Sequence, residues 1–198
     1  MIKTARVGAL FKLLFLTIST VLFNACSHDY TPKPNGYLRI DFPEKKYHLF
    51  NPPNCPFQFE IPDYTVAYAD SNSLSRACWY DINFKQFDGK INLTYIDVNN
   101  DLNTHLENCR KLAYKHAIKA DGIDEYVIES DDHKSSGILY SIAGNAASSL
   151  QFYLTDSTQH FIRGALYFNC PPQSDSLAPV IAFCEKDIDR IIKTIKWK

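Results

Sequence analysis

The chain has 198 residues, of which 45% are hydrophobic and 22% charged, and it carries 13 Phe, 12 Tyr and 2 Trp. This composition is typical of one globular domain with short appendages, and it excludes a wholly disordered or fibrous protein. The formal net charge of −1 excludes the strong basic excess of most nucleic-acid-binding domains, so no nucleic-acid partner is expected.

Residues 1–25 are predicted to be a lipoprotein signal peptide. The charged residues before Cys26 are all basic: Lys3, Arg6 and Lys12. The apolar run from Leu13 to Phe23 is shorter than the roughly 20 residues that a transmembrane helix needs. The small residue Ala25 stands directly before the cysteine, where lipoprotein processing requires one. Two alternatives remain open at this point: an ordinary signal peptide cut near Ala25, or an uncleaved anchor.

Cys26 is the predicted lipidation site, and its lipid is the expected contact with the membrane. Two or more acyl chains anchor a protein stably, whereas one chain is marginal. After removal of the signal, 18 basic and 22 acidic residues remain, a net charge of −4 that does not favour adsorption to anionic lipid. Residues 27–36 contain two prolines and no apolar periodicity, so residues 26–36 are interpreted as lipidated cysteine and flexible tether.

Residues 37–198 are predicted to form a single domain that begins with strands. The first strand-like runs are Tyr37–Phe42 and Phe57–Ile61. Two alternating, aromatic-rich runs, Trp79–Phe87 and Lys90–Val98, then flank Asp88-Gly89. An Asp-Gly pair between two such runs predicts a β-hairpin.

Two helices interrupt the series of strands. Apolar residues recur at three- and four-residue steps from Asp101 to about Ala120, and again from about Asp175 to Ile195. The strands predicted between these helices are Glu125–Glu129, Gly137–Ala143, Ser149–Thr155 and Phe161–Phe168. This order predicts an α+β fold, a mostly antiparallel sheet covered by helices. By analogy, the architecture is similar to the Mog1/PsbP-type sandwich, which says little about function.

The cysteines after the lipidation site are Cys55, Cys78, Cys109, Cys170 and Cys184. Cys55 and Cys78 precede two predicted strands and form the preferred candidate disulfide, which would add about 3 kcal/mol of stability in an oxidising periplasm. Cys109 and Cys184 fall on apolar helix faces and are predicted to be buried thiols. No Cys-x-x-Cys spacing supports a zinc site or a redox motif.

No catalytic, metal or cofactor site is predicted. Asp156, Ser157 and His160 lack a nucleophile elbow, and their spacing is typical of an ordinary turn. His105 and Cys109 are four residues apart on a helix, as two metal ligands can be, but no further ligands are indicated. The preferred interpretation is therefore one surface histidine and one core cysteine.

Two short segments match the Asp-Ser pattern that resembles O-glycosylation sites in Bacteroidetes. They are Asp156-Ser157-Thr158 and Asp175-Ser176-Leu177, which makes Ser157 and Ser176 candidate modification sites. A three-residue pattern also arises by chance, and Ser176 alternatively belongs to a helix N-terminus.

Several sequence blocks are specific in combination, although no single one is. They are Tyr30–Pro34, Gly36–Asp41, Pro43–Tyr47, Cys55-Pro56, Cys78-Trp79, Tyr114–Asp121, Phe152–Ser157, His160–Phe168 and Lys196–Lys198. Together they resemble the gliding-motility lipoprotein GldD family of Bacteroidetes over essentially the whole chain after the signal. The lipid-bearing cysteine of that family falls on Cys26.

The resemblance implies a non-enzymatic envelope lipoprotein required for gliding motility. Lipid processing at Cys26, with an acyl anchor such as palmitate, is compatible with the inner and with the outer membrane. Ser27-His28-Asp29 contains too little acid for a surface-export signal, so the domain is expected to face the periplasm. The implied partners are protein components of the gliding and type IX secretion apparatus, beside which the protein acts as an accessory or scaffold. No catalytic residues are carried over.

A second hypothesis is a periplasmic module that binds glycan or peptide, or a cryptic enzyme. It is based on the abundant Tyr and Trp residues and on His160 and Arg163 in one predicted strand. A concave pocket lined by these groups would favour this hypothesis, whereas a filled aromatic core would count against it.

Overall fold

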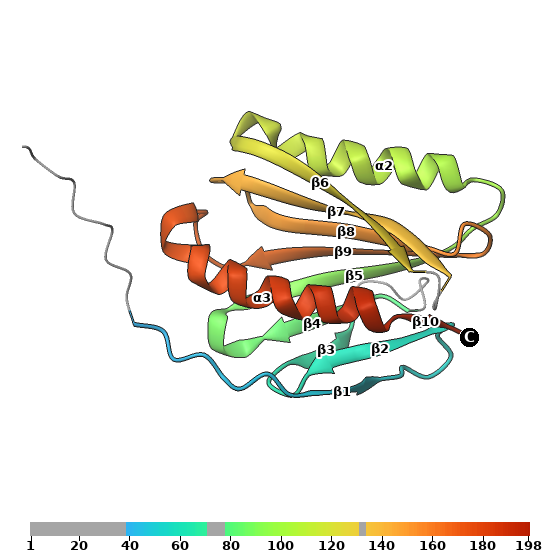
Figure 1. Cartoon of the computed structure of the whole chain (residues 1–198), viewed down its shortest axis with the longest axis horizontal. Coiled ribbons are helices and arrows are strands. Elements are labelled where there is room, and N and C mark those ends of the chain that lie inside the picture. Colours follow the sequence, from blue (N-terminus) through green and yellow to red (C-terminus); the bar gives the residue numbers. More distant parts are fainter. Residues whose placement is uncertain (1–38, 71–77, 131–133) are drawn as a thin grey trace, which may run out of the picture. The chain divides into compact units, whose positions relative to one another are not determined.

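Two antiparallel sheets and two long helices make up the described part of the chain (Figure 1). The computed structural model describes residues 39–70, 78–130 and 134–198. The small sheet has the order β1-β2-β10, and its strands are β1 Tyr47–Phe50, β2 Phe57–Pro62 and β10 Lys196–Trp197.

The large sheet has seven strands in the order β3-β4-β5-β9-β8-β7-β6. In that spatial order they are β3 Val66–Ala69, β4 Tyr80–Phe84, β5 Gly89–Asp97, β9 His160–Phe168, β8 Ser148–Thr155, β7 Ser135–Gly144 and β6 Ala120–Ser130. Every pairing of neighbours in both sheets is antiparallel. The α+β class predicted from the sequence is confirmed.

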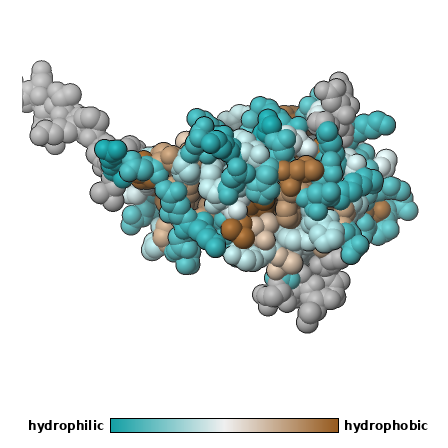
Figure 2. Space-filling view, turned by 90° about the horizontal axis from the view of Figure 1, so that it is seen from below, coloured by the Kyte–Doolittle hydropathy of each residue, from teal (hydrophilic) through white to brown (hydrophobic). Residues whose placement is uncertain are grey.

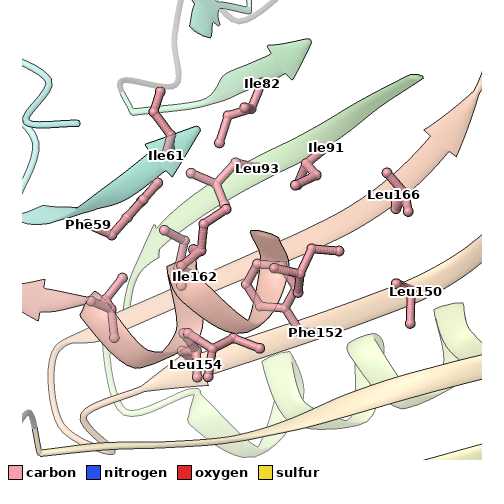
Figure 3. Packing of buried hydrophobic residues seen from close by; sticks show 14 of the residues in the cluster. Phe59, Ile61, Ile82, Ile91, Leu93, Leu150, Phe152, Leu154, Ile162 and Leu166 are labelled. Carbon is pink, nitrogen blue, oxygen red and sulfur yellow. The ribbon is translucent and has the colours of Figure 1, made fainter. Parts of the chain in front are cut away.

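One face of the large sheet carries the main hydrophobic core. Helix α3 (Ser174–Thr194) and the small sheet pack on this face. Figure 3 shows side chains of β2, β4, β5, β8 and β9 gathered around this core, among them Phe59, Ile82, Leu93, Phe152 and Ile162. All five are at most 1% exposed, and along β2, β4 and β5 apolar residues alternate, so that their side chains point to this face.

The opposite face of the large sheet packs against helix α2 (Leu102–Tyr114). Cys109 and Ala113 of α2 are buried together with Tyr140, Tyr153 and Phe161 from the sheet. Strand β8 therefore lies between two apolar layers, and seven of its eight residues are buried. The sequence of a strand that is buried on both faces is a nearly continuous apolar run rather than an alternating pattern.

The hairpin predicted at Asp88-Gly89 is present. Strands β4 and β5 pair antiparallel, and Phe84 lies opposite Gly89. The connection is a 3₁₀ turn, η1 (Lys85–Phe87), followed by Asp88 with a φ of 47°. The strand predicted at Trp79–Phe87 therefore ends at Phe84, because its last residues form the turn.

Helix α2 is shorter than its apolar period predicts. The α-helical hydrogen bonding ends at Tyr114, and a 3₁₀ turn, η2 (Lys115–Ile118), leads directly into β6. Strand β6 begins at Ala120, so the residues assigned to the end of the helix are needed to enter the sheet.

The first predicted strand is wrong within the described residues. Of the predicted strand Tyr37–Phe42, the described residues 39–42 form no strand, and residues 37 and 38 lie outside the described part; the first strand is Tyr47–Phe50. Side-chain packing on α3 holds the preceding segment instead, since the Phe42 ring stacks on Phe183 with centroids 4.5 Å apart. Strands β3 and β10 were not predicted, because they have only four and two residues.

Replacing Gly137 with Ala is expected to destabilise the domain by between about 1 and 3 kcal/mol. A Cβ atom at this position would lie 1.9 Å from the Tyr153 carbonyl oxygen of the neighbouring strand, so the backbone must shift. Chemical denaturation followed by far-UV circular dichroism measures the change. Gly122→Ala is the matched control, because its Cβ meets nothing within 4 Å and its effect is expected to stay within about 0.5 kcal/mol. Equal effects of the two substitutions would contradict the strand packing described here.

Candidate functional site

A pocket of about 960 Å³ opens where strands β2 and β4 begin. Cys55 and Cys78 form a disulfide in its wall, with their Cα atoms 5.5 Å apart. The other lining residues are Asn54, Pro56, Trp79, Tyr95, Ile96, Asp97, His105 and Asn108. We call this site the disulfide pocket.

Antiparallel pairing brings the walls of the disulfide pocket together. Because β4 and β5 run in opposite directions, the first residues of β4 lie beside the last residues of β5. The Trp79 indole N–H accordingly donates to the Tyr95 carbonyl oxygen over 3.0 Å. Cys55 lies just before β2, so the disulfide ties the small sheet to the large one at this edge.

The side chains of Tyr95, His160 and Trp197 fill the space beside the pocket and are joined by hydrogen bonds and ring stacking. The Tyr95 hydroxyl lies 2.7 Å from Asp97 Oδ1 and 2.8 Å from His160 Nδ1. The His160 ring stacks on Trp197 of β10, with centroids 5.2 Å apart. Burial raises the pKa of Tyr95, and its hydrogen bond to Asp97 raises it further, so this hydroxyl stays protonated at neutral pH.

The lining of the disulfide pocket combines exposed hydrogen-bonding groups with an aromatic side chain. The amides of Asn54 and Asn108 and the carboxylate of Asp97 are exposed hydrogen-bonding groups, and Trp79 is partly exposed beside them. Pockets that combine a few polar groups with aromatic and apolar walls are typical of small-molecule binding.

His105 belongs to the pocket wall and is not the surface residue predicted from its spacing. Its side chain is 15% exposed, and its ring packs on Phe161 with centroids 5.5 Å apart. Nε2 lies 3.1 Å from Asp101 Oδ2, within ion-pair distance but not oriented as a hydrogen bond. Cys109, one turn later, is buried in the core, and burial raises the pKa of its thiol to about 11.

The Asp156–His160 segment is a turn, as its sequence predicts. The Asp156 carboxylate accepts the backbone N–H groups of Thr158–His160 at 2.8–3.0 Å. Burial acts to raise the pKa of Asp156, but these donors and the Thr158 hydroxyl lower it to about 2. The carboxylate thus holds the turn, and the His160 ring contacts Tyr95 instead.

His160 and Arg163 do not line one pocket. They are three residues apart on β9, so their side chains point to opposite faces of the sheet. Arg163 donates to Gln151 Oε1 on β8 over 2.8 Å, on the side of α2. The shared pocket that would have favoured the glycan- or peptide-binding hypothesis is therefore not formed by these two residues.

A second notable site is a buried charge cluster on α3. Asp187 is fully buried, and its carboxylate lies 2.7 Å from Lys45 Nζ. The hydroxyls of Tyr47 and Tyr64 donate to the same carboxylate over 3.0 and 2.6 Å. Lys45 also donates to the Phe183 carbonyl oxygen over 2.8 Å, and its Nζ lies 3.3 Å from the Phe183 ring centroid.

The environment of this cluster shifts the ionisation of its members. Burial lowers the pKa of Lys45, and its contact with Asp187 opposes that change. Burial, together with the nearby Asp187, raises the pKa of Tyr47 to about 12 and that of Tyr64 still further. The cluster therefore joins α3 to three places in the chain: to Lys45 before β1 through an ion pair, and to Tyr47 in β1 and Tyr64 between β2 and β3 through neutral hydroxyl donors.

A family model described as gliding motility lipoprotein GldD matches residues 27–197. The chain belongs to the GldD family. The match runs through all the strands and helices described above and confirms the resemblance seen in the sequence.

Among solved structures, the chain is similar to the solution structure of cyanobacterial PsbP (CyanoP) from Synechocystis sp. PCC 6803. The two share 8% sequence identity at a TM-score of 0.47, over 84% of this chain and 98% of that one. This likeness carries no inference about function. A comparison with curated proteins gave no match.

Sequence blocks that carried the GldD resemblance meet at the two sites. Cys55-Pro56 and Cys78-Trp79 line the disulfide pocket, and His160 stacks on Trp197 beside it. Lys45 and Tyr47, from another block, contact Asp187. Residues far apart in the sequence of this GldD-family protein are thus brought together in two places.

Sequence reasoning missed the charge cluster, although a signal was present. The apolar stripe of the last helix includes Cys184 and Ile191, and Asp187 lies between them at steps of three and four residues. An acidic residue at such a position must be buried with a partner, and Lys45 is that partner. Cys184 is buried on the same stripe, as predicted.

The remaining candidate positions lie on the surface or outside the described residues. Ser157, in the β8–β9 turn, and Ser176, in the first turn of α3, are both exposed. Cys170 is an exposed free thiol, and the predicted lipidation site Cys26 falls outside the described part. Within the described segments, neither helix is long and apolar enough to cross a bilayer.

Proposed function

We propose that this protein is a lipid-anchored accessory or scaffold component of the gliding apparatus, acting beside the type IX secretion machinery. The observation that carries this proposal is the GldD family match, which covers the chain from residue 27 to residue 197. The basic residues, the apolar run and Ala25 that precede Cys26 are the sequence pattern that supports a lipid on this cysteine. The protein components of that machinery are the proposed partners, and the domain is proposed to face the periplasm from the inner or outer membrane.

The lipid has a defined physical role in this proposal. It confines the domain to a membrane surface and raises its effective concentration near membrane-bound partners. The ten residues 27–36 reach at most about 35 Å when fully extended, so the domain acts within one protein diameter of the bilayer.

The geometry supports a binding rather than a catalytic role. The groups that most resemble a hydrolase site have structural roles instead: Asp156 caps a turn, and His160 packs between Tyr95 and Trp197.

Two further proposals follow from the position of the domain in an oxidising periplasm. The Cys55–Cys78 bridge forms there, and the exposed Ser157 and Ser176 are available for O-glycosylation.

A second candidate function is a periplasmic module that binds glycan or peptide. The disulfide pocket is the observation that favours it, since exposed amides and a carboxylate stand beside a partly exposed indole. Tyr95, His160 and Trp197 fill the adjacent space, so a ligand of this kind would occupy the disulfide pocket itself.

The test uses a strain that lacks this gene, complemented with the wild-type gene or with Cys26→Ala. We expect loss of spreading in the deletion strain, rescue by the wild type, and failure of Cys26→Ala, with that variant lost from the membrane fraction. Surface levels of a type IX cargo adhesin separate the two roles: lost cargo indicates secretion, and normal cargo with lost spreading indicates the motor. Unchanged cargo and spreading in the deletion strain would refute the scaffold proposal and favour the pocket. If the Cys26→Ala protein is fully active and is still found in the membrane fraction, the lipid anchor is refuted.

A further inference from the structure

Strand β6 is an open edge of the large sheet. With 11 residues it is the longest strand, and β7 is its partner strand within the described residues. Figure 1 shows it at the margin of the sheet, next to α2. An edge strand presents a row of backbone N–H and C=O groups that another extended chain can pair with.

Apolar side chains are exposed along this edge. Tyr126 is 53% and Val127 is 73% exposed, and as consecutive residues they point to opposite faces of the sheet. Ile118, in the turn just before β6, is 92% exposed. A strand added beside β6 would therefore cover exposed apolar side chains on both faces of the sheet.

The charge of β6 selects the partner. Its acidic residues are Asp121, Asp124, Glu125 and Glu129, and the strand contains no Lys, Arg or Pro. All four are exposed, and Glu125 also accepts the Tyr114 hydroxyl over 2.9 Å. A second copy of β6 would place like charges opposite each other, which is destabilising, whereas a basic strand would pair with opposite charges.

The other edge of the large sheet offers less. Strand β3 has four residues, with Val66 and Tyr68 exposed at 37% and 49% and no charged residue. Figure 2, seen from the side of β1–β3, shows small separate apolar areas among hydrophilic side chains. Length, exposure and charge together therefore distinguish β6.

We propose that β6 docks a basic, extended segment of a partner protein, which adds as an eighth strand of the large sheet. Backbone hydrogen bonds would supply affinity, and lysine or arginine side chains opposite Asp124 and Glu129 would supply specificity. This inference names the contact surface of the scaffold and thus rests on the proposed function.

The first test uses the full chain, purified in detergent, and two synthetic 11-residue probes. One probe carries Lys at the four positions opposite Asp121, Asp124, Glu125 and Glu129 and Val elsewhere, and the other probe carries Glu at the same four positions. Hydrogen exchange of residues 120–130, read by mass spectrometry, reports pairing at β6. We expect protection by the Lys–Val probe only, with at least tenfold weaker binding to the variant Asp124→Lys/Glu129→Lys. The matched control Asp175→Lys/Glu185→Lys changes the charge equally at exposed positions of α3 and is expected to bind within twofold of the wild type.

Three outcomes would overturn the proposal: no protection of residues 120–130, equal protection by both probes, or protection that grows with protein concentration alone. The last would identify a second copy as the occupant. In the complemented deletion strain, Asp124→Lys/Glu129→Lys is expected to reduce spreading while its membrane fractionation stays normal. Full spreading with this variant, alongside failure of Cys26→Ala, would refute β6 docking and leave the scaffold function standing.

Discussion

Lys45→Met is expected to lower the free energy of unfolding by about 3 kcal/mol, the lower end of the range for breaking a buried ion pair. The substitution leaves the fully buried Asp187 carboxylate without its charge partner, which lies 2.7 Å away in the wild type. The lower end applies because the Lys45 side chain is itself 24% exposed, so water can reach the vacated position. Urea denaturation at pH 7 measures the loss.

A double variant separates the effect of the unpaired charge from the effect of the lost packing of Lys45. Lys45→Met/Asp187→Asn removes both charges but keeps an oxygen that Tyr47 and Tyr64 can donate to. We expect the double variant to be at least about 1 kcal/mol more stable than Lys45→Met alone, because no uncompensated charge remains in the core. A double variant that is less stable than the single one would show that packing, and not the buried charge, dominates.

The same helix provides a matched control. Lys193 and Asp189 on α3 also lie 2.7 Å apart, but their side chains are 68% and 52% exposed. Exposed pairs contribute little, so Lys193→Met is expected to cost no more than about 0.5 kcal/mol. Equal effects at Lys45 and Lys193 would contradict the role that burial plays here.

Removal of the disulfide by Cys55→Ser/Cys78→Ser is expected to cost about 3 kcal/mol. The bridge spans a sequence separation of 23 residues, and its loss frees that loop in the unfolded chain. It also removes the covalent tie between the segments that precede β2 and β4, so the disulfide pocket is expected to loosen. Thermal unfolding followed by circular dichroism, with and without reductant, measures the effect.

Cys170→Ser serves as the control for this substitution, because Cys170 is an exposed free thiol and its loss is expected to change stability by less than about 0.5 kcal/mol. Reductant is expected to destabilise the wild type and the control equally and to leave the double variant unchanged. Alkylation of Cys55 and Cys78 in protein taken from the periplasm without reductant would show that the bridge is absent in the cell.

Much of the fold could be predicted because its signals are local. Apolar residues alternate in Lys90–Val98 and recur at three- and four-residue steps in the last helix, and both elements lie close to their predicted positions as β5 and α3. The weakest predictions concern short edge elements such as β3, where four residues carry no usable period. Residue propensity and hydrophobic period predict an element poorly where tertiary contacts supply most of its stabilisation.

The candidate sites could be predicted only in part. The spacing of Cys55 and Cys78 before two strands identified the preferred disulfide pair, which the structure also joins. His105 was misplaced on the surface, because the helical period gives its direction on α2 but not the neighbouring chain that covers it. The open edge of β6 was not predicted, since strand order in a sheet depends on long-range pairing.

The sequence by itself predicted the signal peptide and the lipidation site, and it determined the α+β class, the β4–β5 hairpin and the family, because these depend on patterns that can be recognised along the chain without knowing how distant segments pack. Only the tertiary structure decided that Lys45 and Asp187, at opposite ends of the domain sequence, share one buried ion pair. It also decided that His160 and Arg163 point to opposite faces of one strand, and that β6 rather than another strand stands at the edge. Such relations arise from packing between distant segments, which local periodicity does not encode.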